Sequence, residues 1–131
     1  MPRQLNFLDR PAHQDKGYPP LVFVHGGYTH SGCWDVNFLA FFQERGYNCI
    51  AIDLSGHGES DGLDDLNTFG LDDYAEDVGR IVAGLGMEPV LIGHSMGAIV
   101  VQRYLEKSLA RAVVMMAPMP PTGLATSGMQ L

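Results

Sequence analysis

The chain has 131 residues, enough for one domain, and 46% of them are hydrophobic against 18% charged, which is typical of a protein with a buried core. A formal net charge of −7 argues against a nucleic-acid backbone or an anionic membrane surface as the partner. Because no segment has the length of a signal peptide or a membrane span, we expect a cytoplasmic protein that acts on a small molecule.

The first half of the chain predicts two buried strands joined by a helix. An apolar run over residues 21–24 ends at a His-Gly-Gly sequence, and a helix is expected over about residues 34–45, where Gly46 ends it. Residues 49–54 form the second apolar run, and a loop rich in glycine and serine follows it. Both runs are apolar on both faces, as in strands of a parallel sheet.

The second half continues the alternation of strands and helices. Residues 71–85 carry apolar side chains at helical spacing. Residues 90–92 predict a third strand, residues 96–107 a helix, and residues 112–117 a fourth strand. The fold class expected from this order is α/β, with a parallel sheet that has helices on both faces.

The sequence Gly-His-Ser-Met-Gly over residues 93–97 stands between the third strand and the helix after it. A G-x-S-x-G sequence in this context predicts a nucleophile elbow, a tight turn that lifts the serine hydroxyl clear of the backbone. Ser95 should then have a positive φ, and Gly93 and Gly97 should supply the space that the turn needs. The alternative is that Ser95 is only the N-cap of the helix.

Four motifs together resemble the N-terminal half of an α/β-hydrolase fold enzyme, over about residues 20–124. They are His25-Gly26-Gly27, the loop from Asp53 to Ser60, the elbow at Ser95, and Ala117-Pro118 after the fourth strand. The resemblance implies that residues 1–118 are a partial hydrolase core and that residues 119–131 begin a cap. It also implies that the strand at Leu21 lies between those at Cys49 and Val90, with residues 112–117 outside the latter.

The resemblance further implies a serine hydrolase that cleaves an ester or related acyl bond through an acyl-serine intermediate. Ser95 would be the nucleophile, the backbone N–H groups of Gly27 and Met96 would form the oxyanion hole, and Gly93, His94 and Gly97 would complete the elbow. No metal or organic cofactor is expected. The two cysteines, Cys33 and Cys49, lack the spacing of a zinc site or a disulfide framework and are interpreted as structural thiols.

Other polar residues near the motifs have simpler interpretations. We expect His25 to hold the loop that presents Gly27, and Asp53 to brace the loop after its strand. His94 follows the strand directly and should point away from Ser95. His30 and His57 lie on loops at the carboxyl ends of strands, so either is an alternative general base.

The triad acid and histidine of such enzymes follow the serine, but residues 96–131 contain no His, no Asp and only Glu106. We therefore expect the isolated chain to be weakly active or inactive, and to be the front part of a longer hydrolase. The alternatives are a chain completed by a second polypeptide, through self-association or a partner at the exposed edge of residues 112–117, and a non-catalytic ligand-binding or regulatory chain. Tyr28, Trp34 and residues 119–121 are candidates for an acyl pocket.

Overall fold

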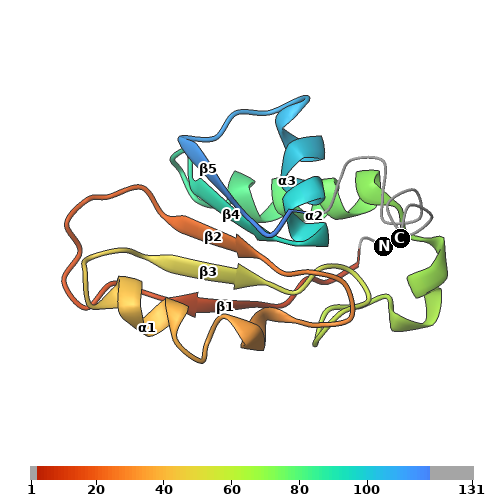
Figure 1. The fold of residues 1–131 in the computed structure, drawn as a ribbon, viewed down its shortest axis with the longest axis horizontal. Coiled ribbons are helices and arrows are strands. Elements are labelled where there is room, and N and C mark those ends of the chain that lie inside the picture. Colours follow the sequence, from red (N-terminus) through yellow and green to blue (C-terminus); the bar gives the residue numbers. More distant parts are fainter. Residues whose placement is uncertain (1–2, 119–131) are drawn as a thin grey trace.

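The computed structural model describes residues 3–118, which form a five-stranded sheet with helices on both faces (Figure 1). The strands are β1 (Phe7–Arg10), β2 (Leu21–Val24), β3 (Cys49–Ile52), β4 (Val90–His94) and β5 (Ala112–Met116). The helices are α1 (Phe38–Gln43), α2 (Leu71–Ala83) and α3 (Met96–Leu105), with short 3-10 helices at Ser31–Cys33 and Leu63–Thr68.

The strands lie in the order β1-β3-β2-β4-β5. Strands β3, β2, β4 and β5 are parallel to one another, with Leu21 opposite both Cys49 and Val90. The strand order expected for these four strands is therefore confirmed.

Strand β1 was not expected, and it makes the sheet mixed rather than wholly parallel. It pairs antiparallel with β3, so that Phe7 lies opposite Ile52. Its sequence, Phe-Leu-Asp-Arg, alternates between exposed and half-buried residues and contains no long apolar run. A short, partly polar edge strand of this kind gives little sequence signal.

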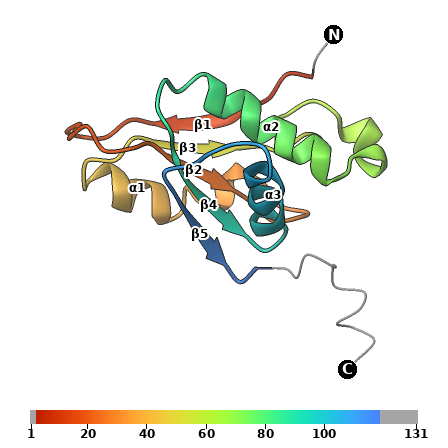
Figure 2. The same cartoon turned by 90° about the horizontal axis from the view of Figure 1, so that it is seen from above.

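Alternate side chains of each strand pack on opposite faces of the sheet, as the period of two requires. On one face, Val22, Ile52 and Leu91 pack with residues of α2 and α3. On the other face, Phe23 and Ile92 pack with residues around α1. Figure 2 shows α1 and α2 on opposite sides of the sheet.

The segment before α1 is less regular than expected. A helix was predicted from about residue 34, but α1 begins at Phe38, after a 3-10 turn in which Trp34 N–H donates to the Ser31 carbonyl. Strand β5 has no neighbour on its outer side among the described residues, and Val114 and Met115 are each 47% exposed. The expected cap over residues 119–131 lies outside the described residues.

Candidate active site

Ser95 lies at the junction of β4 and α3, which begins at Met96. Its backbone has φ 56° and ψ −118°, a combination that a residue with a Cβ atom rarely adopts. Such strain persists only where the surrounding structure fixes it, and it is concentrated at functional sites. The positive φ expected for Ser95 is confirmed.

The glycines on either side of Ser95 are required by the tightness of the turn. A Cβ atom on Gly93 would come within 2.6 Å of the Gly97 carbonyl oxygen. A Cβ atom on Gly97 would overlap the carbonyl oxygens of Val24 and His25, because the start of α3 packs directly on the end of β2. Neither position has room for a side chain, so the G-x-S-x-G spacing has a steric cause.

The side chain of Ser95 makes no capping hydrogen bond, although Ser95 occupies the N-cap position of α3. A capping serine has extended backbone and accepts a hydrogen bond from the second or third N–H of the helix. Here the Ser95 N–H donates to the Met116 carbonyl at the end of β5, 3.0 Å away. The side chain of Ser95 therefore does not cap α3 in the way that the alternative interpretation requires.

The loop after β2 lies against this turn. A Cβ atom on Gly26 would be 3.3 Å from the Cβ of Ser95, and one on Gly27 would be 3.7 Å from the sulfur of Met96. Within residues 3–118, the N–H groups of Gly27 and Met96 donate to no protein acceptor. For Met96 the reason is its position, since the first N–H of a helix has no partner within the helix. The structure thus brings together Ser95, Gly27 and Met96.

His25 is completely buried beneath this loop. Its Nε2 accepts a hydrogen bond from the Leu54 N–H at 3.1 Å, so its Nδ1 carries the proton and donates to the Gly26 carbonyl at 2.6 Å. Burial lowers the pKa of His25 to about 4, so the ring is neutral at pH 7. The expectation that His25 holds the loop is confirmed.

Asp53 joins three separate segments at the carboxyl ends of β2 and β3. Its carboxylate accepts hydrogen bonds from the Ser31 N–H at 2.8 Å, the Asn6 side chain at 2.8 Å and the Glu59 N–H at 3.1 Å. Burial raises the pKa of Asp53, but these hydrogen bonds outweigh it and hold the pKa below its ordinary value. Asp53 is a brace, as expected, whereas sequence reasoning missed Asn6 because it assigned no structure near β1.

The sequence over residues 21–131 matches the family model described as "Alpha/beta hydrolase family". This match covers most of the chain. The chain belongs to the alpha/beta hydrolase family. The resemblance that the four motifs carried is thereby confirmed.

Relatives of this hydrolase-family chain include esterases and haloperoxidases. It is 37% identical over 111 residues to a non-heme haloperoxidase of Rhodococcus erythropolis, covering 82% of this chain and 39% of that protein. It is 37% identical over 113 residues to a bifunctional esterase/perhydrolase of Acinetobacter calcoaceticus, covering 82% of this chain and 40% of that protein.

Solved structures agree with this assignment. A monoacylglycerol lipase of Paleococcus ferrophilus superimposes with a TM-score of 0.76 at 25% sequence identity, over 97% of this chain and 49% of that one. The chain spans about two fifths of the length of the curated relatives it matches.

Among the described residues, the histidines around the turn hydrogen-bond or stack with groups other than Ser95. His30 accepts a hydrogen bond from the Gly32 N–H at 3.0 Å, and Nδ1 of His57 lies 3.0 Å from the Ser55 carbonyl oxygen. The ring of His94 is exposed and meets Trp34 edge-on. Within residues 3–118, no hydrogen bond joins an imidazole to Ser95.

The aromatic candidates for an acyl pocket differ in their surroundings. Tyr28 follows Gly27 with a φ of 61° and a 99% exposed side chain. Trp34 is buried and packs against Phe23 and Phe38, so it belongs to the core. Residues 119–121 lie outside the described residues.

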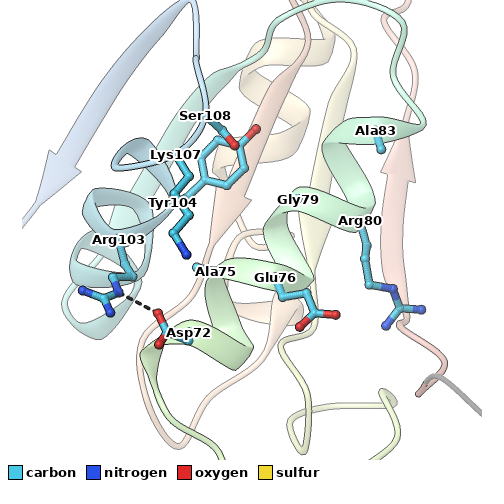
Figure 3. A pocket seen from close by; sticks show the side chains of 10 residues that line it. All are labelled: Asp72, Ala75, Glu76, Gly79, Arg80, Ala83, Arg103, Tyr104, Lys107 and Ser108. Atoms are coloured by element: carbon cyan, nitrogen blue, oxygen red, sulfur yellow. Dashed lines mark hydrogen bonds and ion pairs between the residues drawn. The ribbon is translucent and has the colours of Figure 1, made fainter.

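A groove of about 580 Å³ lies between α2 and α3 (Figure 3). Its charged lining includes Asp72, Glu76, Arg80, Arg103 and Lys107. The Arg103 guanidinium pairs with the Asp72 carboxylate at 2.7 Å and ties the two helices together. None of the three residues that gather at the β4–α3 turn lines this groove, so it is separate from the candidate site.

Among residues 3–118, no three His, Cys, Asp or Glu side chains come together in a way that would hold a metal ion. In the same part of the chain, no helix has the length and apolar character needed to cross a bilayer.

Proposed function

We propose that this chain carries the nucleophile and the oxyanion hole of a serine hydrolase that acts on ester or related acyl bonds. The observation that carries the proposal is the backbone of Ser95, strained at φ 56° and ψ −118° with a hydroxyl that caps no helix. A fold that needed only to start α3 would use an extended, capping residue there. The strained strand-to-helix turn is typical of a nucleophile elbow.

In this mechanism the hydroxyl oxygen of Ser95 attacks the carbonyl carbon of the substrate and passes its proton to a base. The N–H groups of Gly27 and Met96 donate to the oxyanion of the tetrahedral intermediate, and the positive end of the α3 dipole favours the same charge. Each such donor contributes about 2.7–4 kcal/mol to transition-state stabilisation. The intermediate collapses to an acyl-serine, which water then hydrolyses, and no metal or organic cofactor takes part.

The general base that would accept the proton of Ser95 is not identified among the described residues. Residues 96–131 hold no histidine. The imidazole therefore comes either from a loop that precedes Ser95, with His30 and His57 as the candidates, or from a polypeptide segment other than residues 1–131. The same holds for the acid that would orient it.

The test is turnover of p-nitrophenyl esters by the protein at its full natural length. We expect Ser95→Ala to lower kcat by roughly 10³-fold or more, because it removes the attacking atom. Ser108→Ala, three residues after the end of α3, is the matched control and should leave turnover unchanged. Turnover that survives Ser95→Ala would remove the mechanism, and a folded wild-type protein without turnover would favour the non-catalytic, ligand-binding alternative.

Perhydrolysis is a second candidate, because one relative is named as a bifunctional esterase/perhydrolase and others as haloperoxidases. Here hydrogen peroxide replaces water as the acceptor, so that the acyl-serine and H₂O₂ give a peracid and free serine. Peracid formation from an acetate ester, measured by oxidation of bromide, distinguishes the two. Because both reactions use the same acyl-serine, Ser95→Ala should abolish both.

A further inference from the structure

We propose that His25 is a positioning residue for the oxyanion hole, which it serves by fixing the direction of the Gly27 N–H through its hydrogen bond to the Gly26 carbonyl. This inference rests on the proposed serine-hydrolase function. It assigns to His25 a defined effect on the transition state, beyond filling the space beneath the loop.

The peptide unit between Gly26 and Gly27 is trans and is held by His25. No cis peptide bond occurs within residues 3–118, so the Gly26 carbonyl and the Gly27 N–H point in opposite directions. Nδ1 of His25 lies 2.6 Å from the Gly26 oxygen, and the imidazole is completely buried. The carbonyl is therefore directed inward, and the Gly27 N–H is turned outward, to the side where Gly27 is exposed and lies next to Met96.

The sequence on either side of this peptide does not by itself fix the direction of the peptide. Both of its residues are glycines, which populate positive and negative φ about equally. A peptide between two glycines can rotate with little steric resistance, and such a rotation would exchange the outward N–H for a carbonyl oxygen. An oxygen in that position would repel the oxyanion that the N–H is proposed to bind.

The backbone N–H of Leu54 sets the direction of the hydrogen bond between His25 and Gly26. The Leu54 N–H donates to Nε2, which leaves Nδ1 as the protonated nitrogen. In the other tautomer two acceptors, Nδ1 and the Gly26 oxygen, would face each other. The backbone at the end of β3 thus selects the tautomer, and the tautomer selects the direction of the Gly26–Gly27 peptide. His57 packs against the same ring, with 5.0 Å between the ring centroids.

A matched pair of substitutions separates the two nitrogens of His25. In His25→Asn, the amide nitrogen can take the place of Nδ1 and donate to the Gly26 carbonyl. In His25→Gln, the amide oxygen can take the place of Nε2 and accept from the Leu54 N–H, while the donor to Gly26 is lost. If His25 only filled space, the smaller asparagine would not preserve activity better than glutamine does. The proposed hydrogen bond to the Gly26 carbonyl predicts that asparagine preserves more activity.

The experiment measures both variants at the full natural length of the protein, by the ¹H–¹⁵N resonance of Gly27 and by kcat and KM for a p-nitrophenyl ester. We expect His25→Gln to shift or split the Gly27 resonance and to lower kcat by about 10²-fold with little change in KM, as for the loss of one oxyanion donor. His25→Asn should keep the Gly27 resonance and most of kcat. Equal behaviour of the two variants in either readout would overturn the proposal.

Two further results keep the test decisive. If neither variant folds, the imidazole ¹⁵N shifts of the wild-type protein report the tautomer directly, and a proton on Nε2 would overturn the proposal. The proposed function fails separately, through turnover that survives Ser95→Ala. An unmoved Gly27 resonance in His25→Gln, combined with inactive Ser95→Ala, would reject the positioning role alone.

Discussion

His25 links the stability of the fold to pH. Burial, followed by repulsion from His57 and His30, lowers its pKa to about 4, against 6.5 for an ordinary histidine, although Asp53 and the bond to Gly26 act in the opposite direction. Between these values the unfolded chain binds a proton that the native chain does not. The contribution of His25 to the free energy of unfolding is therefore fully present above about pH 6.5 and is lost as the pH falls towards 4.

We expect this effect to remove about 3 kcal/mol from the free energy of unfolding between about pH 7 and about pH 4. Urea unfolding of the wild type and of His25→Gln over that range measures it, since the variant lacks the titrating group and the carboxylates are common to both. The difference in free energy of unfolding between the wild type and His25→Gln should shrink as the pH falls. A difference that stays constant would show that His25 does not titrate as its burial requires.

Two helical glycines should respond in opposite directions to the same substitution. Gly97→Ala would drive a Cβ atom into the carbonyl oxygens of Val24 and His25, so we expect a loss of about 3 kcal/mol or more. At Gly79, in the middle of α2, a Cβ atom would meet only the Tyr104 ring at 3.7 Å. Gly79→Ala should therefore stabilise the protein by about 0.5–1 kcal/mol.

Thermal and urea unfolding measure both glycine variants. The prediction would fail if Gly97→Ala were as stable as the wild type, because the start of α3 would then not pack on the end of β2 as described.

At the level of elements, the sequence predicted those that are strongly apolar or strongly periodic. β2, β3, β4 and β5 were recognisable because each is a continuous apolar run, and α2 because its apolar residues repeat at helical spacing. β1 was missed because a four-residue edge strand with two charged residues has no such run. α1 was placed too early because Trp34, the aromatic residue before it, packs in the core at the end of a 3-10 turn, which periodicity does not distinguish from a helix.

The open edge of β5 should make residues 1–131 associate when they are studied alone. Val114 and Met115 are each 47% exposed on a strand whose outer side has no neighbour among the described residues. Exposed apolar edges pair with other chains. We expect Val114→Lys to reduce the association, as measured by light scattering after gel filtration.

Leu63→Lys is the control for the edge substitution, because Leu63 is 70% exposed but lies in a 3-10 helix away from β5. An equal reduction by both substitutions would point to general hydrophobicity instead of the strand edge. A chain that stays monomeric at all concentrations would contradict the prediction.

For the whole molecule, local motifs placed part of the candidate site and tertiary contacts placed the rest. Ser95 and its glycines were predictable because the turn is a local structure. The contribution of Asn6 was not, because it reaches Asp53 from a segment 47 positions away in the chain. A general base was not predictable either, since a serine hydrolase brings its base to the nucleophile through the tertiary fold and no sequence spacing fixes the position of the base.

We expect residues 1–131 alone to hydrolyse p-nitrophenyl esters feebly, because no imidazole follows Ser95. An oxyanion hole without the rest of the triad retains about 10³–10⁴-fold acceleration over water. Efficient turnover by these residues would contradict the expectation. The variants His30→Ala and His57→Ala would then show which loop histidine is the base.

The most direct measurement is the site at which a serine-directed fluorophosphonate modifies the protein at its full natural length, located by mass spectrometry of its peptides. We expect one phosphonyl group per chain, on the peptide that carries Ser95, and none in Ser95→Ala. Ser108→Ala should be labelled like the wild type. Labelling of a different side chain, or equal labelling of wild type and Ser95→Ala, would contradict the assignment of Ser95 as the nucleophile.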